Sequence, residues 1–303
     1  MDENRVLDQV VERAGEIILG KKRAIRLALV CLLARGHLLI EDLPGVGKTT
    51  LSHVLAKVLG LGFRRIQFTS DLLPADILGV SIFDRRTGGF EFHPGPIFSQ
   101  VILADEVNRA TPKAQSALLE AMEERQVTVE GTTRPLPEPF FVIATQNPSH
   151  QIGTFPLPES QLDRFLMRVQ LGFPGPQAER ELLRGEDRRT LLNRLEPLLE
   201  PSQLQALQKA ATQPTVSSAL LDYLQALLAF SRDSGHYQSG LSPRAGLALL
   251  HAARAHAFLE RQKAVLPEDI QAVLPSVANH RLHLDTPSGD DPVRHLLESV
   301  AVP

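Results

Sequence analysis

Residues 38–50 carry the stretch that decides the fold, Leu-Leu-Ile-Glu-Asp-Leu-Pro-Gly-Val-Gly-Lys-Thr-Thr. Its first three residues are apolar and predict a buried strand, and the apolar residues that recur after Thr50 predict a helix. A strand, a glycine loop, a lysine, a hydroxyl and a helix in this order are the parts of a phosphate-binding loop. Glycine lets the loop turn its N–H groups toward phosphate oxygens, and the amino end of the helix adds partial positive charge. The stretch therefore predicts a nucleotide site.

The expected contacts to the nucleotide come from the loop and from the start of the helix. They are Pro44, Gly45, Val46, Gly47, Lys48, Thr49 and Thr50. We expect Lys48 to reach the β- and γ-phosphates and the Thr49 hydroxyl to hold Mg²⁺. The general pattern has glycine where this chain has Asp42, so a glycine turn that only precedes a lysine is the alternative. The flanking strand and helix favour the nucleotide site.

Composition narrows the class of protein. The 303 residues suffice for one large and one small domain, and 43% of them are hydrophobic, as in ordinary globular proteins. The net charge of −3, the absence of tryptophan and the presence of only two tyrosines argue against a nucleic-acid partner. Cys31, the single cysteine, lies in an apolar periodic run and is expected to be a core thiol. Without a run of 18 apolar residues or a signal-peptide pattern, we expect a soluble cytoplasmic protein with no membrane insertion.

Apolar runs predict a parallel sheet between helices, followed by an all-helical region. The expected strands lie at 38–40, 65–68, 101–104, 140–147 and 165–171. Two turn-rich hairpins are expected at 80–92 and 127–135. Glycine and proline at 172–176 mark the best domain boundary, because helical patterns alone follow it. We therefore predict an α/β nucleotide-binding core at 1–174, with both hairpins inserted, and a helical domain at 177–303.

Acidic and amide side chains end two of the predicted strands. Asp105 and Glu106 follow the apolar run 101–104, and Asn147 ends a later run. After a phosphate-binding loop, Asp105 is expected to hold Mg²⁺ and Glu106 to polarise the attacking water. Asn147 could hydrogen-bond the γ-phosphate and that water. Taken alone, the two acids would more often be surface residues at a strand end, and Asn147 more often a turn residue before Pro148.

Six motifs in this order resemble those of the MoxR family of AAA+ ATPases. They are Pro44–Thr49, Leu103–Ala110, Gln115–Glu124, Ala144–Pro148, Leu162–Phe165 and Ser242–Ala245. The likeness runs from about Gly20 to Leu282, nearly the whole chain. The loop with Asp42 resembles a variant that the family itself uses. The resemblance implies an AAA+ P-loop core with a C-terminal all-α lid, and ATP and Mg²⁺ as ligands.

The resemblance also implies an assembly and further site residues. It implies a ring of identical chains, expected to be a hexamer, with ATP at the subunit boundaries. Asn147 would be sensor 1, Arg164 the finger that reaches the neighbour's γ-phosphate, and Arg244 sensor 2 at the start of a lid helix. From residue type alone neither arginine stands out, and Arg109 and Arg168 are rival candidates for the finger.

The implied function is the remodelling, maturation or activation of client proteins, often partners with a von Willebrand factor A domain. The two hairpins resemble inserts that face the pore or the client in related rings. Two other classes stay open: a nucleic-acid motor, which the charge disfavours, and a nucleotide-gated scaffold with little turnover, which Glu106 disfavours. His280 and His283 have a spacing found in metal sites, but no partner ligand is placed nearby, so we expect a solvated helix end.

Overall fold

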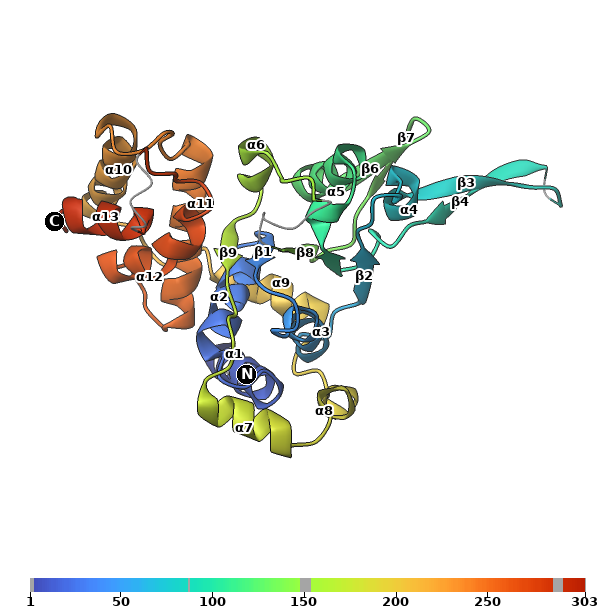
Figure 1. Ribbon diagram of the computed structural model, residues 1–303, viewed down its shortest axis with the longest axis horizontal. Coiled ribbons are helices and arrows are strands. Elements are labelled where there is room, and N and C mark those ends of the chain that lie inside the picture. Colours follow the sequence, from blue (N-terminus) through green and yellow to red (C-terminus); the bar gives the residue numbers. More distant parts are fainter. Residues whose placement is uncertain (1–2, 87, 148–153, 286–290, 303) are drawn as a thin grey trace.

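The computed structural model describes residues 3–86, 88–147, 154–285 and 291–302 (Figure 1). Five parallel strands form one sheet in the order β2-β5-β8-β1-β9. Their bounds are Phe63–Gln67 (β2), Val101–Asp105 (β5), Phe141–Gln146 (β8), Leu38–Glu41 (β1) and Met167–Val169 (β9). The predicted parallel sheet is confirmed. The last strand is shorter than the expected 165–171, because only Leu38–Ile40 of β1 pairs with it.

The sheet is buried on both faces, as the apolar runs require. In β1, Leu38 and Ile40 join the apolar cluster on one face and Leu39 joins the cluster on the other, because successive side chains point to opposite sides. The covering helices are α1 (Glu3–Ile17), α2 (Lys22–Leu33) and α3 (Lys48–Val58) on the first face and α5 (Pro112–Glu124) on the second. Every residue of β5 is buried, which suits a strand between two helical layers.

The carboxyl ends of the strands meet at one edge of the sheet, here called the carboxyl edge. β1 pairs with β8 up to Glu41 and Gln146, and β2 pairs with β5 up to Gln67 and Asp105. Residues 44–50 follow β1 at this edge. The predicted loop and the predicted acids therefore converge there, while the opposite, amino edge is formed by the residues that precede the strands.

Both predicted hairpins are present outside the sheet. α4 (Pro74–Leu78) leads into β3 (Gly79–Asp84) and β4 (Gly89–Pro94), and β6 (Gln126–Val129) pairs with β7 (Thr132–Pro135). The β3–β4 hairpin projects far from the body of the molecule (Figure 1). The Arg134 guanidinium lies 3.9 Å from the centroid of the Phe92 ring, so a cation–π contact joins the two hairpins.

After β9 the described chain is helical, as predicted. The short helices Val107–Arg109 and α6 (Glu159–Leu162) precede that strand. The later helices are α7 (Pro176–Arg184), α8 (Arg188–Arg194), α9 (Pro201–Ala210), α10 (Ser218–Asp233), α11 (Pro243–Leu259), α12 (Pro267–Ala278) and α13 (Pro292–Ser299). α8 contacts α1 and α9 contacts α2, whereas α10–α13 group around one another (Figure 1). Division into separate domains at 174–177 stays a prediction. None of the described helices has the length and apolar character needed to span a bilayer.

Candidate nucleotide site

The loop between β1 and α3 has the backbone of a phosphate cradle. Gly45 and Gly47 have φ of +84° and +98°, in the left-handed region that glycine adopts without strain. α3 begins at Lys48, so the N–H groups of its first turn face the loop without partners inside the helix. An anion in the loop would therefore meet the amino end of α3, where the helix dipole favours negative charge.

The Lys48 side chain is buried and lies at the carboxyl edge. Its Nζ donates to the Asp42 carbonyl at 2.6 Å and to Asn147 Oδ1 at 3.2 Å. Burial lowers the pKa of Lys48, although nearby carboxylates, Asp42 first among them, favour its charged form. These contacts hold the ammonium beside the loop, where it can exchange a carbonyl for a phosphate oxygen.

Two neighbouring strands fix the Asp105 carboxylate at the end of β5. Oδ1 accepts a hydrogen bond of 2.6 Å from Thr145 Oγ1, and Oδ2 accepts from Arg65 Nη2 at 2.7 Å and from Nε at 3.0 Å. The Asp105 oxygens and the exposed Thr49 hydroxyl are the hard oxygen ligands that Mg²⁺ prefers, so the residues present fit the ion. Neither Thr145 nor Arg65 was indicated by the sequence.

Glu106 follows Asp105 with a left-handed backbone, at a φ of +57°. Its Oε1 accepts from Asn147 Nδ2 at 3.0 Å, and its Oε2 accepts from Gln67 Nε2 at 3.1 Å. Arg109 Nε lies 3.2 Å from the same Oε2. Three donors therefore hold this carboxylate at the carboxyl edge, and Gln67 is another contact that the sequence did not indicate.

Asn147 joins the lysine and the glutamate of this site. Its side chain is buried, accepts from Lys48 through Oδ1 and donates to Glu106 through Nδ2. Asn108 Nδ2 donates to the Asn147 carbonyl at 3.0 Å and so fixes the backbone at the end of the strand. The structure thus brings Lys48, Asn147 and Glu106 into one hydrogen-bonded chain, with Asp105 beside it.

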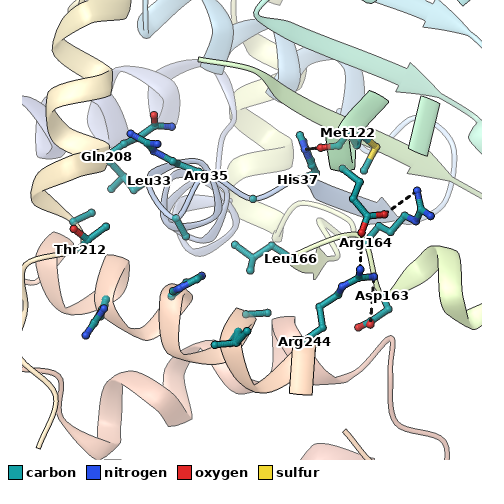
Figure 2. Close-up of a pocket in the computed structure, with 18 of the residues that line it drawn as sticks. Leu33, Arg35, His37, Met122, Asp163, Arg164, Leu166, Gln208, Thr212 and Arg244 are labelled. Atoms are coloured by element: carbon teal, nitrogen blue, oxygen red, sulfur yellow. Dashed lines mark hydrogen bonds and ion pairs between the residues drawn. The ribbon is translucent and has the colours of Figure 1, made fainter. Parts of the chain in front are cut away.

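Arg164 and Arg244 meet at a single carboxylate, that of Glu123 (Figure 2). Arg164 Nη1 lies 3.1 Å from Glu123 Oε2, and Arg244 Nη2 lies 2.6 Å from Oε1. Arg164 also donates to the Leu119 carbonyl at 2.9 Å. Both arginines line a cavity of about 530 Å³ between the core and α11. Because each carboxylate oxygen takes one guanidinium, the two arginines are placed to bind one anion together.

This cavity lies at the amino edge of the sheet. Gly36 and His37, which precede β1, are part of its lining, whereas residues 44–50 follow β1. The four residues of β1 separate the two edges by roughly 13 Å at the usual rise of a strand. The structure therefore brings Arg164 and Arg244 together with each other, and not with the phosphate loop of their own chain.

The two rival arginines lie at the carboxyl edge instead. Arg109 pairs with Glu106, and Arg168 Nη1 lies 3.2 Å from Glu41 Oε2, at the end of β1. Both arginines are therefore paired with carboxylates at the carboxyl edge, which is the edge that carries the phosphate loop. Only Arg164 of the three finger candidates lines the cavity at the amino edge.

Arg281 joins the end of α12 to the segment before β9. Its side chain is 5% exposed, and its Nε pairs with Asp163 Oδ1 at 2.6 Å. Its Nη2 donates to the carbonyls of Asp163 and Phe165 at 3.0 and 2.7 Å. Burial lowers the pKa of Arg281, while Asp163 favours its charged form. No sequence pattern singled out this residue.

The prediction of a solvated helix end is wrong for His280. The ring is buried and its Nε2 lies 3.1 Å from the Phe165 carbonyl, while His283 stays exposed. Burial lowers the pKa of His280, so the ring is neutral at pH 7. In the described part of the chain, no group of three or more histidine, cysteine or acidic side chains could hold a metal ion.

Comparison with known proteins assigns the chain to a family. Residues 37–167 match the model of the ATPase family associated with various cellular activities (AAA), and residues 230–299 match an AAA lid domain. Chaperone MoxR1 of Mycobacterium tuberculosis is 38% identical, with 99% of this chain and 83% of that protein aligned. Protein YeaC of Bacillus subtilis is 42% identical over 100% of this chain and 96% of its own length.

A solved structure agrees with these relatives. A crystal structure of a protein from Cytophaga hutchinsonii superposes with a TM-score of 0.88 at 36% identity, and covers 98% of this chain and 94% of its own. The catalytic core, the lid and the sequence identity over nearly the whole length all agree. The chain belongs to the MoxR family of AAA+ ATPases.

Proposed function

We propose that the chain hydrolyses ATP with Mg²⁺ at the boundary between neighbouring subunits of a ring. The observation that carries this proposal is the separation of the site into two halves. The loop 44–50, Lys48 and Glu106 lie at the carboxyl edge, while Arg164 and Arg244 lie together at the amino edge. Arginines that cannot reach their own loop are available to the loop of a neighbouring copy. The expectation of six subunits rests on the family resemblance.

At the carboxyl edge, this chain's residues bind the phosphates and move one proton. Residues 45–50 donate backbone N–H groups to the phosphates, and Lys48 leaves the Asp42 carbonyl to bind them. Thr49 and Asp105 would hold Mg²⁺, which supplies charge neutralisation at the phosphate oxygens. Glu106 accepts the proton of the attacking water, and Asn147, already bonded to Lys48 and to Glu106, orients that carboxylate.

At the amino edge, Arg164 and Arg244 donate to the γ-phosphate of the neighbour. In the isolated chain Glu123 holds both guanidinium groups with one oxygen each. A phosphate carries more charge than a carboxylate and accepts the same planar donors, so it can replace Glu123. Because Arg244 belongs to α11 and Arg164 to the core, the binding event joins the two parts of the chain to the state of the neighbour's nucleotide.

We infer further that the work of the ring is done on client proteins in the cytoplasm. The printed name of the Mycobacterium relative, Chaperone MoxR1, supports a chaperone role. The projecting β3–β4 hairpin leaves Phe83 and Phe90 half or more exposed, at 51% and 76%, which suits contact with an apolar segment. A client or co-chaperone with a von Willebrand factor A domain rests on the family resemblance alone.

ATP hydrolysis and particle mass test the proposal together. We expect wild type to hydrolyse ATP, and Glu106→Gln and Arg164→Ala to bind ATP and assemble without turning it over. Arg184→Ala, which removes an exposed arginine of α7 outside both halves, is the matched control and should behave as wild type. Normal hydrolysis by Arg164→Ala, or a wild type that stays monomeric while hydrolysing ATP, would refute hydrolysis across a boundary.

A further inference from the structure

Asp42 stands where the general phosphate-loop pattern has glycine, yet the backbone there does not need one. Among the described non-glycine residues, left-handed φ values occur at Arg35, Glu106, Arg125, Glu130 and Arg261, and Asp42 is not one of them. Asp42 therefore imposes no left-handed backbone strain, and its role lies in the contacts that it makes. One oxygen of its carboxylate, Oδ2, binds the segment that follows β9.

The Asp42 carboxylate is bonded to three backbone N–H groups. Oδ2 accepts from Leu171 and from Gly172, each at 2.6 Å, and Oδ1 accepts from Leu43 at 2.8 Å. Hydrogen bonds to an ionised carboxylate are shorter and stronger than those between neutral groups. Leu171 and Gly172 lie just beyond the last strand, where the chain leaves the sheet for the helical region.

The other polar groups of Asp42 bond to the phosphate site. Its carbonyl accepts from Lys48 Nζ at 2.6 Å, and its N–H donates to the Gln146 carbonyl at 3.3 Å, next to Asn147. Asp42 thus contacts three parts of the molecule. These are the loop lysine, the strand that leads to Asn147, and the segment 171–173 by which the chain leaves the sheet, here called the outgoing segment. When Lys48 exchanges the Asp42 carbonyl for a phosphate, the bonds of Asp42 to Leu171 and Gly172 are the direct route by which that change reaches the segment.

The segment 171–173 is also held by the buried Leu171 side chain, and it borders the helical region. Gly172 has a φ of +63° with open space around it, and the Phe173 carbonyl accepts from Lys21 Nζ at 2.6 Å. Leu171 also lines a cavity of about 390 Å³ whose other walls include Lys21 and, from α12, Ser276. A shift of this segment would therefore change a cavity shared by the core and the helical region.

We propose that Asp42 is a positioning residue that holds the 171–172 segment against the phosphate loop, so that the loop and the helical region change state together. The proposal rests on the nucleotide site proposed at residues 44–50. Asp42 itself touches no phosphate in this scheme. It acts through Lys48 on one side and through two backbone amides on the other.

The test restores the general pattern in the full-length chain. Asp42→Gly removes the carboxylate, and Asp42→Asn keeps one acceptor oxygen without the charge. Asp84→Gly is the matched control, because Asp84 also caps a backbone N–H, that of Arg86, but lies in the β3–β4 hairpin. Three readouts are compared: the Kd of a fluorescent ATP analogue, steady-state kcat and KM for ATP, and hydrogen exchange of peptides covering 166–176, with and without the analogue.

We expect Asp42→Gly to bind the analogue within about threefold of wild type while kcat falls at least about fivefold, a split that a loss of phosphate contacts would not give. Exchange of the 171 and 172 amides should rise at least about tenfold and no longer respond to the analogue. Asp42→Asn should give kcat and exchange values between those of wild type and Asp42→Gly, and Asp84→Gly should match wild type.

Two outcomes would overturn the proposal. One is unchanged exchange at 171–172 together with unchanged kcat in Asp42→Gly. The other is loss of analogue binding with exchange at 171–172 unaltered, which would place Asp42 at the phosphates. If wild type itself fails to bind the analogue, the nucleotide site is wrong, and the exchange difference between wild type and Asp42→Gly still decides whether Asp42 holds the segment.

Discussion

Replacing Arg281 by methionine should loosen the helical region from the core. The side chain is 5% exposed and its Nε lies 2.6 Å from Asp163 Oδ1, so the substitution leaves a carboxylate without its main partner. It also removes donors from the carbonyls of Phe165 and Leu166. Breaking a buried ion pair by deleting one partner costs about 3–5 kcal/mol of folding free energy. Asp163 keeps 21% of its side chain in solvent, which places the expected loss near 3 kcal/mol.

The assay is urea unfolding of wild type, Arg281→Met and a control, followed by far-ultraviolet circular dichroism. Arg13→Met is the control, because the Arg13–Glu16 pair is 57% and 59% exposed and should contribute less than about 0.5 kcal/mol. A cycle with Asp163→Asn isolates the pair itself, and should give a coupling of about 1–3 kcal/mol. If Arg281→Met loses no more than Arg13→Met, this contact does not fasten the helical region, and the reasoning fails.

Three further predictions concern single buried groups. Asn147→Ala should slow ATP hydrolysis by about 10–100-fold with little change in the Kd for ATP, since it unties Glu106 from Lys48; a change in Kd alone would contradict this, with steady-state kinetics as the measurement. Burial lowers the pKa of His37 from 6.5 to about 4, so the unfolded chain binds more protons between these values. The neutral ring's contribution to the free energy of unfolding is complete above pH 6.5. It is lost as the pH falls toward 4, by about 2 kcal/mol at pH 5. Urea unfolding of His37→Asn at pH 5 and 7.5 should show a flatter dependence than wild type, and an equal slope would contradict it. Burial also raises the pKa of the Cys31 thiol, so it should react with a thiol reagent only after unfolding; rapid reaction of the native protein would contradict this.

The elements that a local pattern of apolar residues defines were predictable from the sequence. The strands were found because short apolar runs are what a sheet covered on both faces demands, and β5 is buried throughout. Asp105 and Asn147 were predicted as polar residues at the ends of apolar strands, and the fold brings them together because β5 and β8 are parallel neighbours that end at one edge. The strand that ends the sheet was predicted too long, since pairing with β1 stops at Val169 while the apolar run continues.

Contacts between distant segments were not predictable in the same way. Gln67 and Arg65 lie two residues apart on one face of β2, but their bonds to Glu106 and Asp105 depend on β2 and β5 being neighbours. Arg281 is more than a hundred residues from the carbonyls it binds. The placement of α11, which decides where Arg244 lies, follows from helix packing and not from any local signal.

Mixing two inactive variants tests hydrolysis across a subunit boundary most directly. Lys48→Ala lacks the phosphate contact but keeps Arg164, whereas Arg164→Ala keeps the loop and lacks the finger. In rings that mix at random, about one boundary in four joins an intact loop to an intact arginine. We therefore predict that an equimolar mixture hydrolyses ATP at up to about a quarter of the wild-type rate, while each variant alone is inactive. A mixture that assembles and stays as inactive as its parents would contradict the account.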